Sequence, residues 1–69
     1  MEIFEILVTS PPDREKVVAE IWLGNNLIAE INQEKEVCEI EIYSKEKLAF
    51  PFNDFYLALG NAINKLKQV

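Results

Sequence analysis

Three stretches of this chain carry apolar residues at every second position, the period of a β-strand that buries one face. They span residues 16–23, 27–32 and 37–43. Gly24, Asn25 and Asn26 separate the first two stretches, and these residue types tolerate the backbone conformations of tight turns. Short connections between such strands predict an antiparallel meander. The positions predicted to share its buried face are Val17, Ala19, Ile21, Leu23, Leu27, Ala29, Ile31, Cys38, Ile40 and Ile42.

One more strand is predicted before the meander and one helix after it. Residues 2–8 are rich in β-branched and aromatic side chains and end before two prolines, which cannot donate to a ladder. From Phe55 to Leu66, apolar residues recur at three- and four-residue spacing, as in an amphipathic helix. We expect Asn53 to be the N-cap of this helix and Phe52 to pack onto Leu57 as a hydrophobic staple.

These elements predict a single α+β domain over residues 1–69 with the order ββββα. An antiparallel meander of about four strands would carry one C-terminal helix packed on one face. Residues 44–51 are long enough to cross over the sheet to the start of this helix. The connection after the first strand is too long to determine which edge of the sheet that strand occupies.

A row of glutamates is predicted on the face away from the helix. A three-residue loop at 24–26 and a two-residue loop at 34–35 keep all the buried positions on one face. These registers place Glu20, Glu30 and Glu39 side by side, with Trp22, Ile28 and Glu41 in the next rung. Like charges on adjacent strands cost roughly 0.2–1 kcal/mol per pair, so a fold ordinarily avoids them.

Acids interleaved with exposed aromatic residues are typical of protein interfaces. The candidate partner-binding residues are therefore Glu20, Trp22, Glu30, Glu39, Glu41 and Tyr43. The alternative is an ordinary solvated face, with Trp22 covered by the termini or by residues 44–51.

The charge balance favours a basic protein partner. Twelve acids and seven bases give a net charge of −5, Arg14 is the sole arginine, and the lysines are scattered. Direct nucleic-acid binding requires clustered Lys and Arg, so it is not expected. The chain contains no apolar run of membrane length and no signal-peptide pattern, which predicts a cytoplasmic protein without membrane contact. A single cysteine cannot form an internal disulfide, in agreement with a reducing compartment.

The residues that usually carry catalysis are missing. The chain has no histidine, only two glycines and no glycine-rich phosphate loop. Cys38 is expected to lie buried and inert on the helix-facing side, next to carboxylates that do not activate a thiol. Paired glutamates on a flat sheet lack the cleft of a glycosidase, and calcium loops carry ligands that this chain lacks. We therefore expect no enzyme activity, no cofactor and no metal.

The segments AEINQE (residues 29–34) and EIEIY (39–43), followed by the predicted helix, resemble a group of short acidic bacterial proteins. In size and charge the chain also resembles the immunity proteins of toxin–immunity pairs, including those of contact-dependent growth inhibition. That resemblance implies a cytoplasmic protein that binds a toxin domain, often a nuclease, and blocks its basic active site. The alternative is a structural or self-associating module, either a homodimer that buries Val18, Trp22, Ile28, Val37 and Tyr43 or a pair joined at an edge strand.

Overall fold

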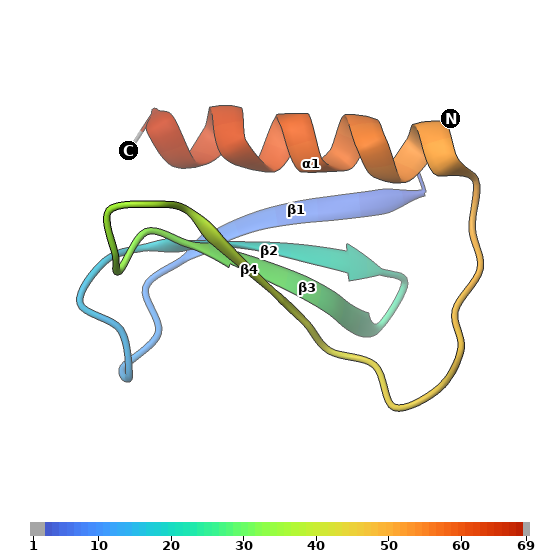
Figure 1. Cartoon of the computed structure of the whole chain (residues 1–69), viewed down its shortest axis with the longest axis horizontal. Helices are drawn as coiled ribbons and strands as arrows, with labels where there is room; N and C mark the ends of the chain where they lie inside the picture. Colours follow the sequence, from blue (N-terminus) through green and yellow to red (C-terminus); the bar gives the residue numbers. More distant parts are fainter. Residues whose placement is uncertain (1–2, 69) are drawn as a thin grey trace.

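The computed structural model describes residues 3–68 and confirms the predicted ββββα order. Four strands form one antiparallel sheet in the order β1-β2-β3-β4, so the first strand pairs with the second (Figure 1). One helix, α1, follows the sheet and lies on one of its faces. The elements are β1 (Phe4–Thr9), β2 (Val18–Leu23), β3 (Asn26–Asn32), β4 (Glu39–Ile42) and α1 (Phe52–Lys67).

The hairpin between β2 and β3 combines a two-residue turn with a β-bulge. Gly24 adopts a φ of 62°, a left-handed conformation that glycine takes without strain, and pairing begins at once on either side of Gly24 and Asn25. Ile21 pairs with Ala29 but Trp22 pairs with Leu27, so Ile28 is an extra residue in β3. The predicted three-residue loop is therefore wrong.

The bulge exchanges the positions of two side chains. Ile28 is buried in the core, and its carbonyl oxygen accepts a hydrogen bond from the Tyr43 backbone N–H at 2.8 Å. Leu27 lies opposite Trp22, on the face away from the helix. The sequence-based prediction had these two residues the other way round, because strict alternation cannot anticipate an inserted residue.

The pairing of β3 with β4 is displaced by two residues from the predicted register. Glu30 lies opposite Glu41, and Glu39 lies opposite Asn32. A slip of two residues leaves each side chain on its expected face, so Ile40 and Ile42 still belong to the helix side.

The slip arises because the β3–β4 connection is longer than two residues. The Asn32 side chain accepts a hydrogen bond from the Glu34 backbone N–H at 3.3 Å, which turns the chain directly after β3. The connection then runs over residues 33–38 and contains Cys38, which is exposed. The expectation of a buried Cys38 on the helix side was wrong, because Cys38 precedes β4 and does not belong to it.

Helix α1 rests on β1 and β2 through one stripe of its surface. Ala58, Ala62 and Leu66 are buried there, and Phe55, Leu59 and Ile63 pack beside them, as the predicted periodicity requires. Phe4, Phe50 and Phe55 close one end of the core, with ring centroids 5.0–5.5 Å apart.

The start of α1 differs from the prediction. Pro51 is the N-cap with an extended backbone, φ −58° and ψ 130°, and no side chain caps the helix. Asn53 therefore falls within the first turn. Phe52 stacks on Tyr56 at a centroid distance of 5.9 Å, and both Phe52 and Leu57 are exposed, so the predicted staple is absent.

The single helix leaves one edge of the sheet uncovered. Strands lie roughly 4.8 Å apart and a helix with its side chains is roughly 10 Å wide, so one helix spans about two strands. Ala29 and Ile31 of β3 are still buried, but the helix side of β4 is left open, and Ile42 is 56% exposed there. Within residues 3–68, α1 is neither long nor apolar enough to cross a membrane.

Candidate interaction surfaces

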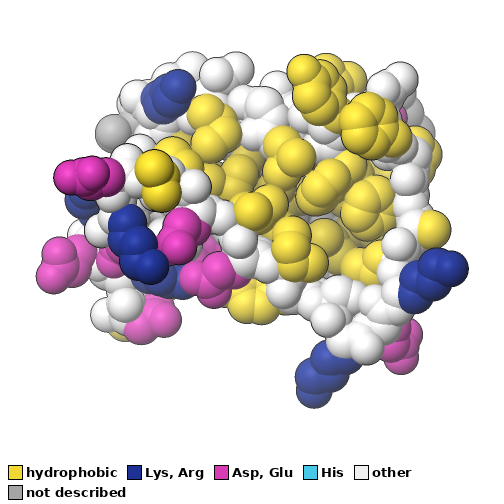
Figure 2. Space-filling model, in the orientation of Figure 1, with side chains coloured by type: hydrophobic (Ala, Val, Ile, Leu, Met, Phe, Trp, Pro, Cys, Tyr) yellow, Lys and Arg dark blue, Asp and Glu magenta, His cyan; other side chains and the backbone are white. Residues whose placement is uncertain are grey.

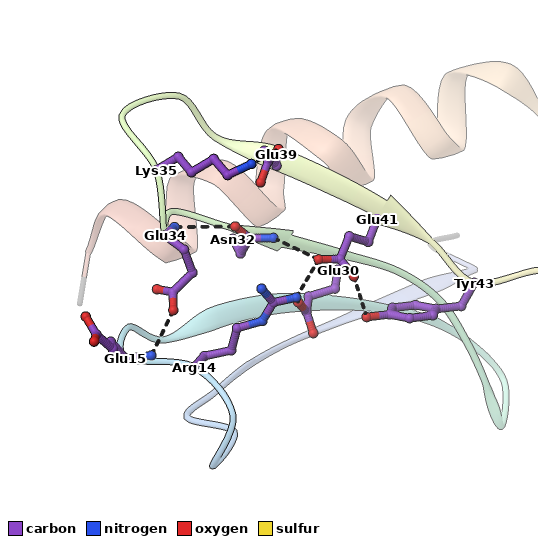
Figure 3. A network of polar contacts seen from close by, with 9 residues as sticks. All are labelled: Arg14, Glu15, Glu30, Asn32, Glu34, Lys35, Glu39, Glu41 and Tyr43. Atoms are coloured by element: carbon purple, nitrogen blue, oxygen red, sulfur yellow. Dashed lines mark hydrogen bonds and ion pairs between the residues drawn. The ribbon is translucent and has the colours of Figure 1, made fainter.

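The face away from the helix carries an ion-paired row of glutamates. Strand pairing aligns Glu20, Glu30 and Glu41 across β2, β3 and β4. Arg14, from the β1–β2 connection, lies over this row (Figure 3). Its Nη2 atom donates to Glu30 Oε2 at 2.8 Å and also to Glu41 Oε1. One guanidinium thus bridges two strands and offsets the repulsion between neighbouring carboxylates.

Further donors complete the row. The fully buried Asn32 donates from Nδ2 to Glu41 Oε1 at 3.4 Å, and the Tyr43 hydroxyl donates to Glu41 Oε2 at 3.2 Å (Figure 3). Trp22 donates from Nε1 to Glu20 Oε1 at 3.1 Å. We call Arg14, Glu30, Asn32, Glu41 and Tyr43 the acidic network. Among the described residues, no buried side-chain nitrogen or oxygen lacks a hydrogen-bond partner.

The acidic network determines the protonation states of its members. The hydrogen bond from Arg14 lowers the pKa of Glu41 below its ordinary value, and the charge of Arg14 adds to this effect. Burial raises the pKa of the Tyr43 hydroxyl, and the nearby charges of Glu30 and Glu41 raise it further. The hydrogen bond to Glu41 also raises the pKa of Arg14. At neutral pH, Glu41 is therefore an ionised acceptor and Tyr43 a neutral donor.

The β1–β2 connection is also tied to the β3–β4 connection. The Glu34 carboxylate accepts the backbone N–H groups of Glu15 at 2.8 Å and of Lys16 at 3.2 Å. Arg14 therefore belongs to a segment whose neighbours are anchored, which lowers the entropy cost of holding its side chain over the glutamates.

All six predicted site residues lie on the face away from the helix, but only five of them belong to the row and its hydrogen bonds. Glu20 is linked to Trp22, while Glu30, Glu41 and Tyr43 belong to the acidic network. Glu39 lies apart from the acidic network in an exposed ion pair with Lys35 at 3.3 Å. Glu30 is only 7% exposed, so little of its carboxylate is presented to a partner.

Arg14 and Asn32 were not predicted as site residues. The signal for Arg14 was present in the sequence, since aligned carboxylates require a cation and this chain has one arginine. The signal for Asn32 depends on the two-residue slip, which brings Glu41 within reach of its amide.

The opposite face carries an open apolar surface. Ile40 and Ile42 lie on β4, Leu48 lies in the connection that follows, and three residues lie on α1. Each of these six side chains is between 44% and 76% exposed. We call them the open apolar face: Ile40, Ile42, Leu48, Phe52, Tyr56 and Leu57. Apolar side chains form one continuous area in this view, while acidic side chains gather to one side (Figure 2).

Two depressions mark the open apolar face. One of about 280 Å³ lies between β3, β4 and the connection to α1, and its apolar lining includes Ile28, Ile42, Leu48 and Phe50. The other, of about 500 Å³, follows the outer side of α1 from Tyr56 to Asn64. No group of three or more potential metal-ligating His, Cys, Asp or Glu residues occurs in residues 3–68.

Comparisons with protein-family models, with curated proteins and with solved structures found no match to this chain.

Proposed function

We propose that this chain is a protein-binding module, not an enzyme, and that it binds through the open apolar face. One observation carries the proposal: six large hydrophobic side chains are 44–76% exposed on one side of a 69-residue chain. Scattered exposed hydrophobic residues are normal on protein surfaces, but a contiguous patch is typical of an interaction site. Burial of apolar surface contributes roughly 25 cal/mol per Å², so the patch offers a substantial driving force for association.

The composition of α1 supports the same surface. No charged residue occurs between Asp54 and Lys65, although 28% of the whole chain is charged. A surface helix ordinarily carries polar and charged residues on its outer side, and a helix that is apolar on several sides is covered by something else. The outer side of α1 therefore has the character of a contact surface.

The second candidate is an inhibitor of immunity type that binds a basic toxin domain through the acidic face. The observation in its favour is electrostatic: Glu20, Glu30 and Glu41 carry three negative charges and Arg14 one positive charge, which leaves two negative charges there, and the chain as a whole carries −5. Tyr43 is exposed beside these groups. We rank this candidate second because Arg14 already pairs with Glu30 and Glu41 and because Glu30 is only 7% exposed.

Site-specific photo-crosslinking in the cells that express the protein separates the two candidates. The photoreactive residue p-benzoylphenylalanine would replace Ile42 on the open apolar face or Tyr43 on the acidic face. Leu7 is the matched control, because it is exposed, apolar and paired with Glu20 on the face away from the helix.

We expect discrete adducts with the probe at position 42 and none with the probe at position 7. Adducts that form at position 43 and not at position 42 would favour the acidic face and overturn the primary proposal. An absence of adducts at position 42, with the variant folded by circular dichroism, would overturn it as well.

A further inference from the structure

We infer that the occupant of the open apolar face is a second copy of this chain, with the α1 helix of each copy lying over β4 of the other. The inference rests on the proposed function and names its partner. A two-fold axis would make the contact reciprocal, so that one surface patch serves both copies.

The first argument is that β4 is uncovered on the helix side of the sheet. Helix α1 lies over β1 and β2, and on the same face β4 is uncovered, so a second helix would lie over β4 at the open edge of the sheet. The sixteen residues of α1 are roughly 24 Å long, comparable with the 25 Å and 31 Å extents of the molecule. A second α1 therefore fits beside the first, and the two helices would be enclosed between two sheets.

The second argument is that both halves of such a contact are apolar. The open strand β4 presents Ile40 and Ile42, and the outer side of α1 presents Phe52, Tyr56 and Leu57. In the inferred dimer these two surfaces cover each other. If two copies instead paired through their β4 edges, the apolar surfaces of β4 and of α1 would both stay exposed. We therefore favour the face-to-face arrangement.

Gly60 provides an independent observation. It lies in the middle of α1, where glycine is unfavourable, and it lines the depression along the outer side of the helix. A Cβ atom added at Gly60 would meet nothing within 4 Å, so packing within the chain does not require a glycine there. Close approach of a second helix gives the reason for a residue without a side chain at this position.

The distribution of charge permits self-association despite the net charge of −5. Glu20, Glu30 and Glu41 lie on the face away from α1, and residues 55–64 carry no charge. The two acidic faces would thus point outward on opposite sides of the dimer. A basic partner, by contrast, would find a single carboxylate, Glu46, among the described residues that line the two depressions.

The aromatic residues of the open apolar face supply part of the area that a stable contact needs. A standard interface buries about 800 Å² per partner, about 15% of the 5236 Å² accessible surface of this chain. Phe52 and Tyr56 are 76% and 64% exposed, and at roughly 150–250 Å² per aromatic side chain they alone contribute about 200–350 Å².

The test begins with the mass of the purified chain in solution. Sedimentation velocity from about 1 µM to about 500 µM should detect a reversible species of about 16 kDa, twice the 8.0 kDa of one chain. Leu57→Glu should raise the dimer dissociation constant at least tenfold, whereas Leu7→Glu, the same change on the other face, should leave it within about twofold.

Gly60→Gln keeps the result interpretable if an introduced acid disturbs folding. This change improves helix propensity, so the monomer should become more resistant to heat while the dimer dissociates more readily. If Gly60 had a structural role within the monomer, Gly60→Gln would instead lower both the resistance of the monomer to heat and the stability of the dimer.

Cross-linking tests the arrangement of the two copies. In a Cys38→Ser background, a mixture of Leu57→Cys and Ile42→Cys chains should be joined by a short bismaleimide, because each copy places α1 on the β4 of the other. Ile42→Cys chains that cross-link only to themselves would indicate edge pairing and overturn the inference.

Other outcomes are equally decisive. A monomer at every concentration, or a dimer unaffected by both Leu57→Glu and Gly60→Gln, would overturn the inference. If the chain is monomeric while the photoreactive residue at position 42 captures a different protein, the proposed function stands and the second copy is excluded as the partner. If position 42 captures nothing, the proposed function fails as well.

Discussion

Replacement of Leu66 with alanine should separate the two sides of α1 most clearly. Leu66 is 2% exposed and packs into the core over β1 and β2, so its truncation removes buried methyl groups and leaves a cavity. Such substitutions cost about 3–5 kcal/mol. A domain of 69 residues has a total unfolding free energy of roughly 3–10 kcal/mol, so this one change removes a large part of it.

Leu57→Ala is the matched control. It makes the same change on the same helix, and the gain in helix propensity from leucine to alanine is small in both variants. Leu57 is 61% exposed, and loss of its remaining contacts should cost about 1 kcal/mol in the monomer. Leu66→Ala should therefore lower the Tm by at least about 12 °C and Leu57→Ala by at most about 8 °C. The measurement is thermal unfolding followed by circular dichroism at a chain concentration of a few micromolar.

If Leu66→Ala and Leu57→Ala lowered the unfolding free energy equally at low concentration, the orientation of α1 would be refuted. A cost below about 1 kcal/mol for Leu66→Ala would mean that the helix does not rest on the sheet through this stripe. At a hundredfold higher concentration the cost of Leu57→Ala should rise, because Leu57 lies on the face that we infer to be shared between two copies.

Three further predictions concern the other elements. The pKa of Glu41 is lower in the folded chain than its ordinary value of 4.5. The ionised Glu41 therefore stabilises the fold above about pH 4.5, and this stabilisation is lost as the pH falls through the folded pKa. Arg14→Met should flatten the decline of the unfolding free energy below about pH 5, measured by urea unfolding. An equally steep acid limb in Arg14→Met would contradict the role of Arg14. Gly24→Ala should cost about 1–2 kcal/mol, seen as a lower Tm, because the φ of 62° strains any residue with a Cβ, and a neutral result would mean that the turn relaxes. Cys38 should react with Ellman's reagent in the native state, and a thiol that reacts only in denaturant would contradict its exposure.

The element order and the two faces of the sheet were predictable from the sequence. Alternation at Ile21, Ala29 and Ile31 requires a half-buried strand, and the spacing of Ala58, Ala62 and Leu66 requires a helix with one buried stripe. Both patterns depend only on local backbone geometry. The ββββα order and the inner surface of α1 are accordingly confirmed.

The strand registers were only partly predictable. Parity distinguishes a slip of one residue, which turns buried side chains outward, but it cannot distinguish a slip of two. The hydrogen bond between Asn32 and the Glu34 backbone, together with the anchoring of Glu34 to the β1–β2 connection, starts the turn directly after β3. Glu41 therefore replaces Glu39 in the row beside Glu30.

The sequence by itself determined which residues form strands and helix, which of their side chains turn inward, and that three acids share one face. Only the tertiary structure decided that Arg14 pairs with two glutamates of the row and that α1 lies over β1 and β2 while β4 stays open. The physical reason is one of range. Periodicity is a property of adjacent residues, whereas the path of a loop and the lateral position of a helix on a sheet depend on contacts between segments distant in the chain. The most prominent surface of the molecule, the open apolar face, belongs to this second kind.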